Sequence, residues 1–199
     1  MSIDRFSGYE SIDRAFKHSA EILRLLRKDL DEVLADSPFK DRLTIVVTGS
    51  FGRGEASPES DLDLFMFFDS DKPEDTLQEE KAAIKATVDK YIKKPAGDTG
   101  TFGSDVIVKF NDMLKNLGGD KDFNVLLTRR MLFLLEGKWL YGEERFKSYR
   151  KDLLTRYIKA GDPERQISRF LENRSFTFLS TQALLLSVTL NSKSVVIVR

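Results

Sequence analysis

Two aspartates, Asp61 and Asp63, stand two residues apart at the head of an apolar run. In an extended segment alternate side chains point to one side, so both carboxylates share a face while Leu62 and Leu64 point into the core. Carboxylates held side by side repel each other at neutral pH unless a cation lies between them. Because hard oxygen ligands suit Mg²⁺ or Mn²⁺, the pair predicts a divalent metal site.

A glycine-rich turn precedes the aspartates. Its sequence, GSFGRG at residues 49–54, directly follows a β-branched run at residues 43–48 that predicts a buried strand. Because Gly49 lacks a side chain, backbone N–H groups there can approach a phosphate, and the Ser50 hydroxyl adds a donor. The segment lacks the Gly-Lys-Ser/Thr of a P-loop, so it predicts a phosphate site of another kind.

The order of these parts is more informative than any one of them. A strand, Gly-Ser, Arg-Gly, Ser-Asp-x-Asp-Leu and a second strand follow one another within residues 43–68. Acidic residues concentrate in residues 55–80 and basic residues in 129–159, which suits a site for metal and polyphosphate, although two solvated helix faces would look the same. The set favours phosphoryl-type transfer, in which the protein positions groups and two metal ions neutralise charge.

Composition excludes several other chemistries. The 199 residues include 32 basic and 32 acidic ones, and this balance argues against an extended nucleic-acid contact. The absence of cysteine excludes disulfides, thiolate zinc sites and a cysteine nucleophile, and a single histidine argues against a Ser-His-Asp triad. No targeting signal and no stretch of about 20 apolar residues is apparent, so we expect a cytoplasmic protein with no membrane contact.

Hydrophobic periodicity predicts an α/β (α+β) chain. The expected helices cover residues 9–35, 74–93, 126–135 and 143–159, and the expected strands cover 43–48, 62–68, 106–110 and 139–141. We expect a domain over residues 1–160 and the start of a helical C-terminal segment, which may be truncated, over 161–199. The apolar end of the chain suggests contact with an oligomeric partner.

The run GSFGRGEASPESDLDL, residues 49–64, resembles the signature of the polymerase-beta-type nucleotidyltransferase superfamily. In particular it resembles the bacterial branch related to the uridylyl- and adenylyltransferases that modify nitrogen-signalling proteins. A looser similarity lies in LLTRRMLFLLEGKWLYGEERF, residues 126–146, because that branch often carries an arginine-containing turn and then a Leu-x-Gly-acidic element. The resemblance covers about residues 40–146.

The resemblance implies a small mixed β-sheet flanked by helices, the nucleotidyltransferase fold. It also implies transfer of a nucleoside monophosphate from an NTP, ATP by default, with release of pyrophosphate. By this analogy Gly49 and Ser50 bind the triphosphate, and Arg53 neutralises phosphate charge. Asp61 and Asp63 ligate magnesium.

Many members of the superfamily carry a third carboxylate on the next strand, which acts as the base for the acceptor hydroxyl. Asp105 is the candidate for this role, and Asp98 is the runner-up. Without a third acid, the chain would be a catalytically inactive nucleotide-binding regulator or an antitoxin-like module. A purely structural protein is the remaining alternative. Arg129 and Arg130 either reach the triphosphate or are exposed helix residues.

The acceptor stays open at this point. A protein hydroxyl, a small molecule or a nucleic-acid end would each fit the predicted reaction. Lys109 alternates with the core positions of its strand. Its side chain therefore faces either the site or solvent, and we expect it to face solvent.

Overall fold

A computed structural model of the chain describes residues 9–70, 73–94, 102–103, 106–115, 117, 124–159, 188–191 and 194–197. The chain divides into two compact units, Met1–Lys159 and Ala160–Arg199. The first unit contains the residues singled out above.

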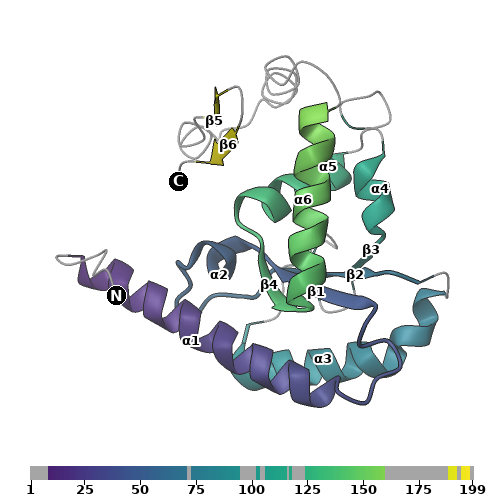
Figure 1. Ribbon diagram of the computed structural model, residues 1–199. Helices are drawn as coiled ribbons and strands as arrows, with labels where there is room; N and C mark the ends of the chain where they lie inside the picture. The colour runs from purple at the N-terminus through teal and green to yellow at the C-terminus, as the bar shows by residue number, and fades with distance from the viewer. Residues whose placement is uncertain are drawn as a thin grey trace. The chain divides into compact units, whose positions relative to one another are not determined.

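A four-stranded sheet lies at the centre of the first unit (Figure 1). Its strands are β1 (Leu43–Val47), β2 (Leu64–Phe68), β3 (Ile107–Val108) and β4 (Lys138–Tyr141). They lie in the order β3-β2-β1-β4; β1 runs antiparallel to β2 and β4, whereas β2 and β3 are parallel. The expectation of a small mixed sheet flanked by helices is confirmed.

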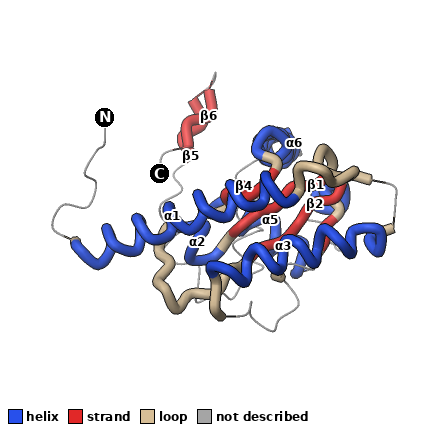
Figure 2. The backbone as a smooth tube through the Cα atoms, turned by 90° about the horizontal axis from the view of Figure 1, so that it is seen from below, coloured by secondary structure: helices blue, strands red, loops and turns tan. Residues whose placement is uncertain are grey.

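Helices cover both faces of this sheet. They are α1 (Glu10–Val33), α2 (Gly49–Arg53), α3 (Gln78–Tyr91), α4 (Phe110–Leu114), α5 (Asn124–Leu135) and α6 (Glu143–Lys159), and a 3₁₀ turn, Glu74–Leu77, precedes α3. Helices α1 and α3 lie side by side on one face, and α6 lies on the other (Figures 1 and 2).

The two inner strands, β1 and β2, are buried along their whole length, and they are apolar apart from Thr44 of β1. Alternate residues of β2 therefore enter two different cores. On the side of α1 and α3, Leu64 and Met66 pack in a mainly aliphatic core with Ile45. On the side of α4, α5 and α6, Phe65 and Phe67 pack in an aromatic core. Burial on both faces fixes the register of β2 and therefore the place where it begins.

Several element boundaries differ by one or two residues from the expected ones, and differences at β2 and β3 bear on the site. The hydrogen-bonded part of β2 begins at Leu64, two residues later than expected, so the two aspartates precede the strand. The strand expected over 106–110 is restricted to Ile107–Val108, because Phe110 begins the short helix α4. Phe110 stacks on Tyr149 of α6 at a centroid distance of 4.2 Å, a tertiary contact that periodicity does not reveal.

The second unit contains a two-stranded antiparallel sheet, β5 (Val188–Asn191) and β6 (Ser194–Ile197). Residues 161–187, where a helical segment was expected to begin, lie outside the described residues. In the described part of the chain, no helix has the length and apolarity that a membrane crossing would need.

Candidate active site

The pairing of β1 with β2 brings the glycine turn and the aspartates together. Val47, the last residue of β1, lies opposite Leu64, the first residue of β2. The segments immediately after β1 and before β2 are therefore neighbours. A hydrogen bond of 2.8 Å from the Thr48 N–H to the Asp63 carbonyl oxygen continues this pairing beyond the strands.

Gly49 is the point of closest approach between these segments. It has a positive φ of 64°, in the region that glycine adopts most readily. A Cβ atom built on Gly49 would lie 2.3 Å from Oδ2 of Asp63. Glycine is therefore required here twice, for its backbone conformation and for the space that the Asp63 carboxylate fills. The structure places one predicted metal ligand directly against the predicted phosphate turn.

Asp61 and Asp63 keep the alternation expected of an extended segment. Leu62 between them is fully buried, whereas both aspartates are partly accessible. Burial raises the pKa of the Asp63 carboxyl, and the negative charges of Asp61 and Glu136 raise it further. Lys94 forms an ion pair with Asp61, with Nζ 3.8 Å from Oδ2, and the lysine side chain is exposed.

This excess of negative charge fits a divalent cation. Unrelieved repulsion between neighbouring carboxylates is what a bound Mg²⁺ ion removes, and carboxylate oxygens are the ligands it prefers. Within the described parts of the chain, no cluster of three or more metal-ligating side chains occurs.

The predicted third carboxylates, Asp105 and Asp98, lie outside the described residues. Strand β3 is described, and it runs parallel to β2 with Ile107 opposite Met66. Its amino-terminal end therefore lies at the same edge of the sheet as the start of β2.

The glycine turn itself forms the short helix α2. Ser50 occupies the second position of this helix, where no earlier helical carbonyl is available to its N–H group. Thr48, the preceding residue, provides no side-chain cap. Ser50 thus combines an N–H group and a hydroxyl, both donors, at the edge of the sheet where Asp63 lies.

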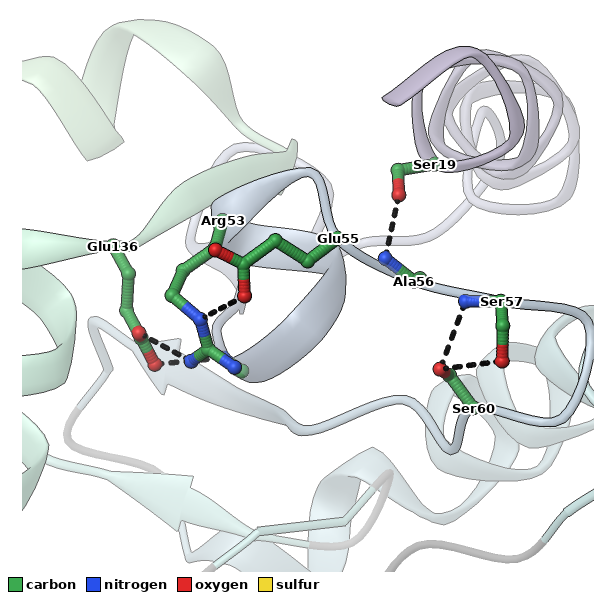
Figure 3. A network of polar contacts seen from close by, with 8 residues as sticks. Ser19, Arg53, Glu55, Ala56, Ser57, Ser60 and Glu136 are labelled. Carbon is green, nitrogen blue, oxygen red and sulfur yellow. Dashed lines mark hydrogen bonds and ion pairs between the residues drawn. The ribbon is translucent and has the colours of Figure 1, made fainter. Parts of the chain in front are cut away.

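A buried carboxylate that the sequence analysis did not single out joins this site. Glu136 lies between α5 and β4, and Figure 3 shows its side chain directed at Arg53 of α2. Oε1 of Glu136 accepts a hydrogen bond of 2.8 Å from the Gly49 N–H, and Oε2 accepts one of 2.7 Å from Nη1 of Arg53. The Glu136 side chain is only 6% exposed.

Arg53 is held on two sides. Its Nε donates to Glu55 at 2.7 Å, in addition to the bond from Nη1 to Glu136 (Figure 3). Burial alone would lower the pKa of the guanidinium, but the hydrogen bonds to Glu55 and Glu136 raise it above its ordinary value. Arg53 therefore carries its positive charge within the site in a fixed position.

The segment between α2 and the aspartates is also anchored. The Ala56 N–H donates to the Ser19 hydroxyl of α1 at 2.9 Å, and the Ser57 N–H donates to the Ser60 hydroxyl at 3.0 Å (Figure 3). These bonds fix both ends of the loop that leads into Asp61.

Two other cations singled out by sequence have different places. Arg130 is completely buried and donates from Nη1 to the Met113 carbonyl at 3.1 Å, so it joins α5 to α4. Lys109 is exposed and lines a cavity of about 850 Å³. This cavity includes Asp69, which follows the other end of β2, and its lining contains neither aspartate of the pair nor the glycine turn.

Two comparisons relate the sequence to known proteins. A search of the curated proteins finds no match. Residues 26–106 match the family model described as "Nucleotidyltransferase domain". The matched range contains the last part of α1, then β1, α2, the aspartate pair, β2 and α3, and it ends immediately before β3. The sequence motif, the fold and this match together support placing residues 26–106 in the nucleotidyltransferase superfamily.

Proposed function

We propose that the protein transfers a nucleoside monophosphate from an NTP to an acceptor hydroxyl, in the presence of Mg²⁺, and releases pyrophosphate. The nucleotidyltransferase domain supports the general reaction. The observation that carries the assignment of residues is the contact between the Asp63 carboxylate and Gly49, since it joins a candidate metal ligand to a candidate phosphate turn.

Each chain residue has a separate task in this proposal. Gly49 contributes its conformation and its missing Cβ, because its own N–H is directed at Glu136. Ser50 donates from its N–H and its hydroxyl to phosphate oxygens of the triphosphate. Arg53 contributes fixed positive charge at the same edge, which lowers the cost of bringing a polyphosphate beside carboxylates.

Asp61 and Asp63 would hold the metal ions. When bound there, Mg²⁺ neutralises charge on the triphosphate and stabilises the leaving pyrophosphate, which is what an in-line displacement requires. The raised pKa of Asp63 fits this role, because its charged form gains most from a neighbouring cation.

Asp105 is our candidate for the third carboxylate. In the proposed step the acceptor oxygen forms a bond to the α-phosphorus while the bond from that phosphorus to the pyrophosphate oxygen breaks. The Asp105 carboxylate takes the proton of the acceptor hydroxyl, and pyrophosphate leaves with the bonding electron pair. ATP is the default donor, and a protein, a small molecule or a nucleic-acid end is the acceptor.

The test is incubation with α-labelled NTPs and Mg²⁺, with candidate acceptors from each of the three classes. We expect transfer of label to an acceptor together with release of pyrophosphate, and neither from the double variant D61A/D63A. Mg²⁺-dependent NTP binding without pyrophosphate release would assign the chain to the inactive nucleotide-binding class. If the wild type neither binds NTP nor releases pyrophosphate, the proposal is wrong.

A further inference from the structure

We propose that Glu136 is a positioning residue of the nucleotide site, which sets NTP affinity by holding the Gly49 turn and Arg53 in place. This inference rests on the proposed function, since it concerns the same site. Glu136 comes from the connection between α5 and β4, outside the range that matches the nucleotidyltransferase domain.

Both carboxylate oxygens of Glu136 accept hydrogen bonds. One accepts from the main-chain N–H of Gly49 and the other from the guanidinium of Arg53, at 2.8 and 2.7 Å. Glu136 therefore joins the beginning of α2 to its end. Hydrogen bonds to an ionised acceptor are shorter and stronger than neutral ones, and burial of the pair removes competing water.

The main chain of Glu136 also packs closely against α2. A Cβ atom built on Gly52 would lie 2.5 Å from the Glu136 carbonyl oxygen, so α2 packs directly on this connection. Likewise, a Cβ atom on Gly137 would lie 2.4 Å from the Phe133 carbonyl oxygen. Gly52 thus allows α2 to approach the main chain of Glu136, and Gly137 allows the tight turn at the end of α5.

The consequence for the site follows from Gly49. The bond to Glu136 fixes the Gly49 N–H, so it limits rotation of the turn that carries Ser50 and abuts Asp63. Without the carboxylate, the Gly49 N–H and Arg53 each lose a buried acceptor. The triphosphate would then meet donors that must be ordered during binding, and affinity would fall.

The experiment compares E136A and E136Q with the wild type. The glutamine amide has one acceptor oxygen and one NH₂ group. It can therefore accept from the Gly49 N–H or from Arg53, but not from both, so E136Q rescues only part of the interaction. E80Q is the matched control, because Glu80 is a comparably buried glutamate that also accepts a hydrogen bond. Glu80 lies in the first turn of α3, and its partner is the Ser37 hydroxyl. The probe is an α,β-methylene analogue of ATP with Mg²⁺, and calorimetry gives its Kd.

We expect E136A to raise the Kd by about tenfold or more, since loss of a charge-assisted bond leaves buried donors without an acceptor. We expect E136Q to fall between E136A and the wild type, and E80Q to keep the wild-type Kd even if its Tm falls. If E136A does not fold, the Kd of E136Q compared with that of E80Q tests the positioning role. Wild-type affinity or tighter binding in the Glu136 variants would overturn the positioning role. A wild type that does not bind the probe at all would instead overturn the proposed function, and this inference with it.

Discussion

The two ends of strand β2 differ in how they arrange charge. Before its first residue, Asp61 and Asp63 lie near the glycine turn, and Arg53 and Glu136 form a largely buried pair beside them. After its last residue, Asp69 borders a cavity of about 850 Å³. This cavity therefore lies at the end of β2 that is remote from the predicted chemistry.

The charges at the cavity end are mostly solvated. Lys115 and Asp112 form an ion pair of 2.8 Å there, and both side chains are largely exposed. Such pairs contribute about 0–1 kcal/mol. Coupled, partly buried groups and a glycine required by close approach therefore mark the candidate site, whereas the cavity does not include it.

The largest effect is expected from the aspartate pair. The double variant D61A/D63A should lower nucleotidyl transfer by about 10³-fold or more, because a bound metal ion contributes several kcal/mol to the transition state. Pyrophosphate release measures this loss, and circular dichroism shows whether the fold is kept. Turnover within tenfold of the wild type would show that the metal is held elsewhere.

The next effect is expected from G49A. An alanine at position 49 would have to adopt a left-handed backbone conformation, which lowers the free energy of unfolding by about 1–2 kcal/mol. Its Cβ would also displace the Asp63 carboxylate. We expect both a lower Tm and at least about tenfold weaker binding of Mg²⁺ with ATP.

G54A is the control for this substitution. Gly54 also has a positive φ, 81°, but a Cβ atom there would first meet Phe16, at 3.2 Å. G54A should therefore share the loss of stability and keep the nucleotide affinity. Equal losses of affinity in G49A and G54A would contradict the role of the contact between Gly49 and Asp63.

A smaller effect concerns pH and Asp63. Its pKa is raised in the folded state, so the folded protein holds more protons than the unfolded chain between the ordinary and the raised value. Without metal, stability should fall as pH rises through that window. D63N should consequently have a higher Tm than the wild type at neutral pH in EDTA, and the difference should disappear below about pH 3.9. A lower Tm for D63N under these conditions would show that the charged carboxylate is stabilised by its surroundings.

The smallest effect is expected at the cavity end. K109A removes an exposed side chain from the cavity lining and should leave the Kd for Mg²⁺ with ATP within about twofold of the wild type, as for most surface substitutions. A tenfold loss would place part of the nucleotide site at the wrong end of β2 and so remove the distinction between the two ends.

The local parts of the site could be predicted from sequence. Leu62 packs in the same core as Leu64 and Met66, whereas the aspartates on either side of it are partly accessible, which is the alternation expected of an extended segment. The place of Gly49 in a turn directly after a buried strand was also predicted, whereas its contact with Asp63 and its positive φ are known only from the structure. The predicted features depend on a few consecutive residues.

Glu136 could not be predicted in the same way. It lies 87 residues from Gly49 and 83 from Arg53, so only the packing of α2 against the connection after α5 reveals the contact. The one signal in the sequence was the Leu-Glu-Gly run at residues 135–137. It matched the Leu-x-Gly pattern of the resemblance, but that pattern assigns no role to the carboxylate. Arg130 illustrates the reverse case, because a charged residue on a helix gave no sign of complete burial.

Ligand-induced stabilisation tests the central claim most directly. The Tm of the wild type and of D61A/D63A would be measured with ATP alone, with Mg²⁺ alone and with both. If Asp61 and Asp63 hold the metal beside the Gly49–Ser50 turn, the wild type should gain about 5–10 °C only when both are present at about 100 times Kd, and the double variant should gain nothing. An equal gain in the double variant, or no gain in the wild type, would contradict the account.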